Sequence, residues 1–365
     1  NVTVITNEGE RRQRKISKIF TFSGMNKLEV DSAKAGDQVA IAGIDDIYVS
    51  QTITDDPNAE PLPSISIDPP SLAIEFMVND SPFAGTEGKY VTSRHILDRL
   101  EKELETNVGL KIEKKENSDA IKVFGRGEMH IAVLIESMRR ECFEVQISQP
   151  EVIMQEIDGV KHEPVENAVV NVPDEMSGSI IEALGKRKGI MTNMVSENGN
   201  TMMEFDIPTR GLLGFRSQFL LLTKGEGTLF HAFNKFAPYM GKIQKRQVGS
   251  LISQENGTAL TFSLFNLQAR GPLFISAQTS VYEGMIIGEH NQGTDLTVNP
   301  CKGKKLTNVR ASGSDDAMSL TPPVPMTLEK AIEYIKEDEY VEITPGNIRL
   351  RKKFLKEHER KRLSK

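Results

Sequence analysis

Cations and amides gather in one polar stretch, residues 288–310, with the sequence GEHNQGTDLTVNPCKGKKLTNVR. It shows neither helical nor strand periodicity. A loop of this length is unusual in a compact domain unless it is functional or disordered, and Asn, Thr, Lys and Arg side chains hold phosphate and sugar oxygens. The stretch therefore predicts contact with a large polyanion. The residues expected to make it are Lys302, Lys304, Lys305 and Arg310 for phosphates, Asn291, Asn299 and Asn308 for hydrogen bonds, and His290 for a base.

Two further basic stretches are candidates for the same partner. Residues 231–249, HAFNKFAPYMGKIQKRQVG, contain no acid and carry aromatic rings among the cations. That mixture suits an RNA backbone and unstacked bases, although it could equally be a domain boundary. The second stretch ends a helix, where cations also complement the helix dipole, so both interpretations stay open. The candidate residues are Lys235, Lys242, Lys245 and Arg246, and Lys186, Arg187 and Lys188.

The last 17 residues, 349–365, carry nine cations and two anions, a net of +7. The whole chain has a net charge of −6, so the remainder sums to −13. We expect this tail to be helical and to contact a polyanion through Arg351, Lys352 and Lys353, because like charges cost stability without a counter-charge. An acidic membrane surface competes, but the apolar face is thin.

Signatures of catalysis are absent from the sequence. It has no G-x-x-x-x-G-K-[ST] phosphate loop, no G-x-S-x-G and no HExxH. Its six histidines lack metal-ligand spacing, and Cys142 and Cys301 make no disulfide framework, which fits a reducing cytoplasm. We therefore expect no catalytic residue, cofactor or metal. Two alternatives remain: an RNA-processing enzyme using His290 with Glu289 or Asp295, and a protein-interaction scaffold.

The elements that position these residues predict an α+β chain of several domains, since 365 residues exceed one core. Short strands in residues 1–68 suggest part of a small barrel, and the apolar start suggests a fragment of a longer protein. Residues 69–150 show the order βαββαβ of a ferredoxin-like fold, with helices at 93–107 and 128–141. Residues 151–233 repeat it, with a helix at 210–223. Residues 234–365 form a β-rich terminal domain, in which LISQ and ALTFSLF pair across Asn256-Gly257.

Three segments carry a resemblance to a known family. Residues 125–153, GRGEMHIAVLIESMRRECFEVQISQPEVI, resemble the third domain of translational GTPases of the elongation factor G kind. Residues 163–191 and 209–233 resemble their fifth domain. The run LTVNPCKGKKLTNVRASGSDDAMSLTPP, residues 296–323, resembles the C-terminal domain of the BipA/TypA GTPases and is the most specific of the three.

The resemblance implies the ribosome-docking half of such a GTPase, with residues 1–68 as part of the second-domain barrel. The GTP-binding domain is missing, so the resemblance implies no enzyme here, and GTP and Mg²⁺ would belong to the parent. The partners implied are the A-site side of the ribosome, A-site tRNA and 23S-type rRNA, with the 288–310 loop as the contact. A cytoplasmic monomer without membrane contact, associated with stress and cold response, virulence and large-subunit assembly, is implied for the parent.

Overall fold

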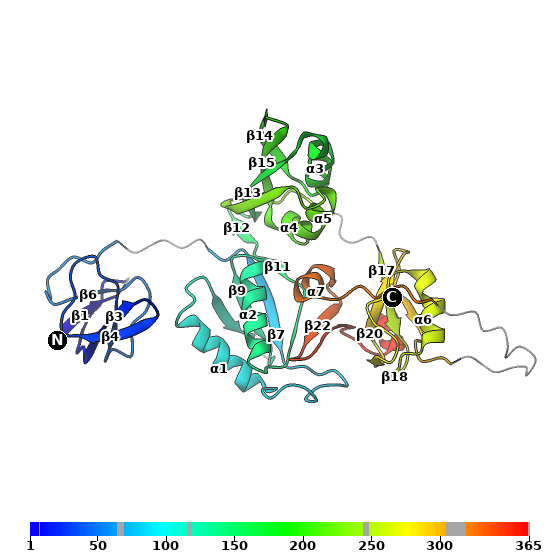
Figure 1. Ribbon diagram of the computed structural model, residues 1–365, viewed down its shortest axis with the longest axis horizontal. Helices are drawn as coiled ribbons and strands as arrows, with labels where there is room; N and C mark the ends of the chain where they lie inside the picture. Colours follow the sequence, from blue (N-terminus) through cyan, green and yellow to red (C-terminus); the bar gives the residue numbers. More distant parts are fainter. Residues whose placement is uncertain (7, 64–68, 116–117, 244–247, 304–318, 364–365) are drawn as a thin grey trace, which may run out of the picture. The chain divides into compact units, whose positions relative to one another are not determined.

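The structure is a computed structural model that describes residues 1–6, 8–63, 69–115, 118–243, 248–303 and 319–363 (Figure 1). The chain divides into two compact units. One comprises Asn1–Asp68 with Glu101–Gly109, and the other Pro69–Leu100 with Leu110–Lys365. Within the described ranges, no helix has the length and apolar character needed to cross a membrane.

The first unit contains two small antiparallel sheets. In each sheet the central strand pairs with a neighbour on both sides, and Val4 and Ile5 of the first sheet are buried. The described residues form no closed barrel, so the predicted barrel fragment is seen only as separate sheets. The strands are β1 (Val2–Ile5), β2 (Arg11–Arg14) and β6 (Thr52–Thr54) in one sheet, and β3 (Lys18–Ser23), β4 (Asn26–Val30) and β5 (Val39–Ala42) in the other.

The second unit begins with the predicted βαββαβ order. Its strands run antiparallel in the order β10-β7-β9-β8. Ile131, Ile135 and Met138 recur at helical spacing, and they are buried on the face that packs on the sheet. The elements are β7 (Leu72–Met77), α1 (Ser93–Leu104), β8 (Lys111–Lys114), β9 (Ile121–Gly125), α2 (Glu128–Arg140), β10 (Val145–Ile147) and β11 (Glu151–Val152), which also pairs with β7.

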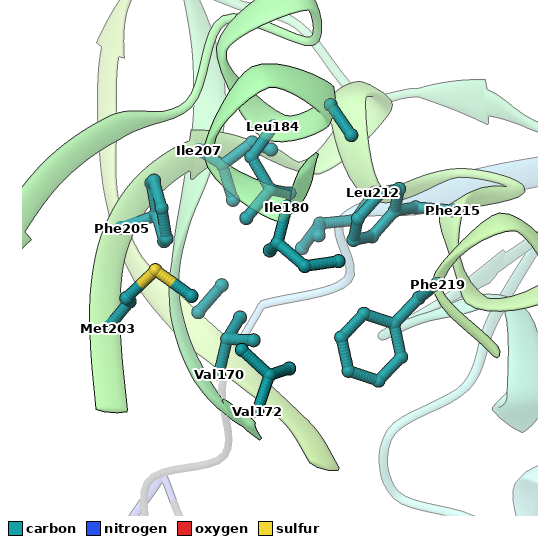
Figure 2. Close-up of a cluster of buried hydrophobic side chains, with 12 residues drawn as sticks. Val170, Val172, Ile180, Leu184, Met203, Phe205, Ile207, Leu212, Phe215 and Phe219 are labelled. Atoms are coloured by element: carbon teal, nitrogen blue, oxygen red, sulfur yellow. The ribbon is translucent and has the colours of Figure 1, made fainter. Parts of the chain in front are cut away.

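The same order recurs in a second sheet, β16-β13-β15-β14 with β12 at the end of β13. Figure 2 shows its core, in which Ile180 and Leu184 of one helix meet Phe205 and Phe219. The single helix predicted for 210–223 is two helices, because Gly214 takes a left-handed φ of 67° between them. The elements are β12 (Gln155–Ile157), β13 (Val160–Pro173), α3 (Asp174–Lys186), β14 (Ile190–Glu197), β15 (Asn200–Pro208), α4 (Thr209–Leu212), α5 (Phe215–Leu222) and β16 (Thr228–Pro238).

The C-terminal residues extend the first ferredoxin-like sheet. The strand order is β21-β17-β20-β23-β22-β10-β7-β9-β8, and Val145 of β10 pairs with Ile343 of β22. Residues 69–150 and 234–365, predicted as separate domains, therefore share one sheet. The added strands are β17 (Gly249–Ser253), β20 (Met285–His290), β21 (Leu296–Val298), β22 (Glu339–Ile343) and β23 (Ile348–Lys352).

Two short-range predictions in this region are corrected. The segment ALTFSLF is not a strand, because Thr261–Leu267 is the helix α6, and the Leu264 N–H donates to Leu260 O at 3.0 Å. Gly257, the second residue of the predicted turn, begins β18 (Gly257–Thr258), which pairs with β19 (Ser280–Val281) and not with LISQ. The remaining helices of the described residues are the 3-10 turn η1 (Gln268–Arg270), α7 (Leu328–Tyr334), which is capped by Thr327, and α8 (Glu357–Leu363).

Candidate nucleic-acid interface

The polar stretch 288–310 begins inside the sheet. His290 ends β20 and is only 4% exposed. Its Nδ1 lies 2.6 Å from Thr294 O, so the ring closes the turn between β20 and β21. Asp295 accepts a hydrogen bond from Ser250 N at 2.9 Å and contacts Lys352 Nζ at 2.5 Å. The structure thus corrects the prediction for His290, because a ring held there cannot stack on a base.

The amides and cations of the stretch differ in their surroundings. Asn291 is exposed, and its backbone N–H donates to Arg270 O at 2.9 Å. The Asn299 Oδ1 accepts from Cys301 N at 2.9 Å, so this amide orders its own turn. Lys302 is exposed. Asn291 and Lys302 therefore remain available to a partner, while Lys304, Lys305, Asn308 and Arg310 lie outside the described residues.

The basic tail is the segment whose structure differs most from the prediction. Arg351 and Lys352 lie in β23, and each is 1% exposed. Lys352 Nζ contacts Asp295 at 2.5 Å, Asp338 at 2.7 Å and Glu339 at 2.9 Å. Burial opposes its charge, but these carboxylates outweigh burial and raise the pKa of Lys352 above the usual range. Neither buried cation can reach a phosphate, which corrects the prediction for both, whereas Lys353 is half-buried.

Buried carboxylates explain why these cations are inside. Glu342 is fully buried and accepts from Tyr282 OH at 2.8 Å and from Arg349 Nη1 at 2.8 Å. Asn79 Nδ2 donates to Glu144 at 2.8 Å and to Glu342 at 3.2 Å. A charge without a partner is costly to bury, so Arg349 and Lys352 of β23 neutralise Glu342 and Glu339 of β22, whereas Arg351 contacts Asp80 and Gln146. The two acids of EYVEI, together with the cations of RLRK, were the sequence signal for this network.

The Lys186–Lys188 group separates in the structure. Lys186 Nζ pairs with Glu182 at 2.6 Å on the exposed surface of α3. Arg187 donates to Gly211 O at 2.8 Å and Leu213 O at 3.0 Å, and its guanidinium lies 5.1 Å from the Phe215 ring centroid. Burial lowers the pKa of Arg187. Arg187 therefore ties α3 to the α4–α5 turn, and only Lys186 and Lys188 are exposed.

The first eight residues of the aromatic-basic stretch, 231–238, belong to β16. Lys235 Nζ pairs with Asp206 at 2.9 Å, and the rings of Phe233 and Phe236 lie 5.4 Å apart. Arg210 covers the Tyr239 ring at 4.6 Å. Lys242 is exposed. Lys245 and Arg246 lie outside the described residues.

Sequence reasoning missed two carboxylates that meet at the start of α5. Glu128 Oε1 accepts from Gly214 N at 3.2 Å, and Glu333 Oε2 accepts from Ser217 Oγ at 2.8 Å. Burial, and then the charge of Glu333, raise the pKa of Glu128 to about 7. No local pattern marks either acid, because they come from α2 and α7. Among the described residues, no group of three or more His, Cys, Asp and Glu side chains could hold a metal ion.

Two family models and several known proteins match this chain. Residues 160–247 match the elongation factor G C-terminus, and residues 248–357 match the TypA/BipA C-terminal domain. The large ribosomal subunit assembly factor BipA of Escherichia coli strain K12 is 50% identical over 363 residues, 99% of this chain and 60% of that protein. BipA of Haemophilus influenzae strain KW20 is 50% identical over 99% of this chain and 59% of its own length. BipA of Bacillus subtilis strain 168 is 46% identical over 100% of this chain and 60% of its own length. The chain thus spans about 60% of the length of these relatives.

Proposed function

This chain is a BipA/TypA homologue whose residues 248–357 match that family's C-terminal domain, and we propose that it is the ribosome-binding part of a large-subunit assembly factor. The observation that carries the proposal is the identity of about 50% over 99% of the chain with proteins named for that role. GTP hydrolysis, with GTP and Mg²⁺, then belongs to the part of the relatives that this chain does not cover.

We propose that the 288–310 stretch is the RNA contact. Asn291 and Lys302 are exposed, and Lys304, Lys305, Asn308 and Arg310 continue the same run of amides and cations. Their counterpart is 23S-type rRNA and the acceptor end of A-site tRNA, with the chain docked on the A-site side in the cytoplasm. Of the other candidates, Lys186, Lys188, Lys235 and Lys242 keep exposed ammonium groups that can add phosphate contacts.

The test is sedimentation of the purified chain with 30S, 50S and 70S particles over a series of salt concentrations. Removing one cation that binds a phosphate makes the slope of log affinity against log salt shallower by about one. We expect Lys302→Ala combined with Lys305→Ala to weaken pelleting with unchanged Tm. The matched control is Lys18→Ala, an exposed lysine paired with Glu29 at 2.9 Å and outside every candidate stretch. Pelleting of the double variant equal to that of the wild type at moderate salt contradicts the proposal.

The enzyme alternative loses its local support in the structure. His290 Nδ1 faces Thr294 O, and Asp295 is held by Ser250 N and Lys352. These two groups therefore have structural partners that account for their positions. The scaffold alternative predicts binding that survives nuclease treatment of the particles, whereas the RNA contact predicts its loss.

A further inference from the structure

Over β7, β8 and β9, one face of the shared sheet carries none of the helices α1, α2 and α7, whereas further along the same side Leu264 of α6 clusters with Met285 and Ile287 of β20. The helices α1 and α2 lie over β7 and β9 on the opposite face (Figure 1), and α7 packs against α2. Strand β9 shows the alternation, because Ile121 and Val123 are buried against the helices while Lys122 and Phe124 are partly exposed. We call the uncovered side, which bears Lys122 and Phe124, the open face.

Two lysines lie near the Phe124 ring on this face. Lys111 of β8 is its cross-strand partner, and Lys111 Nζ is 5.6 Å from the ring centroid. Lys122 Nζ, two residues before Phe124, is also 5.6 Å from it. A partly exposed ring with ammonium groups beside it offers both a stacking surface and positive charge.

Tyr340 of β22 lies on the same side of the sheet, and its ring centroid is also 5.4 Å from the guanidinium of Arg351, which is 1% exposed. Its neighbour Val341 pairs with Ile147, which pairs with Phe76, and these three side chains form the covered face. By alternation, Tyr340 and Glu75 point the other way. Lys353 Nζ lies 4.9 Å from the Tyr340 ring centroid.

Carboxylates on the open face pair with the lysines but leave them able to bind phosphate. Glu75 pairs with Lys115 at 2.8 Å, Glu113 pairs with Lys111 at 2.8 Å, and Glu151 lies 4.0 Å from Lys122. The lysine side chains in these pairs are 64%, 55% and 38% exposed for Lys111, Lys115 and Lys122. Exposed ion pairs contribute little and are screened by salt, so a phosphate can compete for each ammonium group.

From these contacts we infer that the open face binds single-stranded RNA, with bases stacked on Phe124 and Tyr340 and phosphates at Lys111, Lys115, Lys122 and Lys353. Strands β9 and β22 are separated by β7 and β10, so the two rings lie about 14 Å apart across the sheet at the usual strand spacing. Sheet faces with aromatic rings and cations accommodate sites of about four nucleotides or more. The identity of the bound RNA as ribosomal RNA rests on the proposed function.

The test is fluorescence anisotropy of the full chain with a labelled ten-nucleotide oligouridine, at two salt concentrations. We expect Phe124→Ala to weaken binding about tenfold, within the range for loss of one base–aromatic stack. Lys122→Glu, which keeps the Phe124 ring, should also weaken binding and make it less salt-dependent. Tyr340→Phe should bind like the wild type because it keeps the stacking surface.

The matched control is Phe230→Ala, since Phe230 is 68% exposed on the other ferredoxin-like sheet. Circular dichroism melts establish that each variant folds. Unchanged affinity of both Phe124→Ala and Lys122→Glu overturns the inference, as does equal binding of a ten-base-pair RNA duplex, whose bases cannot stack on the rings. Oligouridine binding that depends on Phe124 supports this inference. Unaltered ribosome pelleting of the Lys302–Lys305 variant contradicts only the proposed function, so the two proposals can fail separately.

Discussion

The carboxylate of Glu128, at the start of α2, accepts a hydrogen bond from the backbone N–H of Gly214, immediately before α5. The bond joins the first ferredoxin-like fold to the second at a helix N-terminus, where a carboxylate is favoured by the exposed N–H groups. Glu333 of α7 reaches the same turn through Ser217. Two acids held this close cannot both ionise without cost.

The first prediction concerns pH. Burial, followed by the charge of Glu333, raises the pKa of Glu128 from 4.5 to about 7. Between these values the folded chain holds a proton that the unfolded chain releases. The contribution of Glu128 to the free energy of unfolding is therefore fully present below pH 4.5 and is lost as the pH rises through 7. The loss is about 3 kcal/mol at most.

Glu128→Gln should remove this dependence, because the amide keeps an oxygen for Gly214 N and carries no charge. We expect its Tm to exceed that of the wild type at pH 8 and to match it near pH 5. Melting curves at intervals of half a pH unit provide the measurement, with Glu226→Gln on the surface as the control. A wild-type and a variant Tm that change in parallel from pH 5 to 8 would refute the role of Glu128.

Local patterns predicted the two βαββαβ units well. Ile131, Leu134, Ile135 and Met138 recur at helical spacing, and all four are buried in α2. The helices predicted at 93–107 and 128–141 are α1 (Ser93–Leu104) and α2 (Glu128–Arg140). Signals of this kind depend on residues within one or two turns of each other, so a single sequence contains them completely.

Pairings between distant segments were not predictable from the sequence. Val145 pairs with Ile343, although the whole second ferredoxin-like fold lies between them in the chain. Without that pairing, Arg351 and Lys352 resemble a solvated basic tail, because nothing local shows that Glu339 and Glu342 are buried beside them. The candidate site failed there for the same reason: a lysine that neutralises buried acids and one that binds phosphate have the same local sequence.

The second prediction concerns two glycines with opposite requirements. Gly214 has a φ of 67°, a left-handed conformation, and a Cβ added there would lie 3.5 Å from Glu333 Cβ. Gly178 lies within α3, and a Cβ added there would meet nothing within 4 Å. Gly214→Ala should destabilise by about 1 kcal/mol, whereas Gly178→Ala should stabilise by a similar amount. Urea denaturation of both variants measures the difference, and equal effects of the same sign would contradict the assigned backbone conformation.

The third prediction separates folding from RNA binding at Lys352. Its ammonium group is the shared partner of Asp295, Asp338 and Glu339, so Lys352→Met leaves buried negative charge without its counter-ion. We expect a loss of about 3 kcal/mol or more in the free energy of unfolding. Lys353→Met, its half-buried neighbour, is the matched control and should cost well under that. If Lys352→Met unfolds at the same urea concentration as the wild type, the buried network is not what holds β23 in the sheet. Because the expected loss is one of stability, weaker ribosome pelleting by Lys352→Met must be compared at a temperature where both proteins are folded.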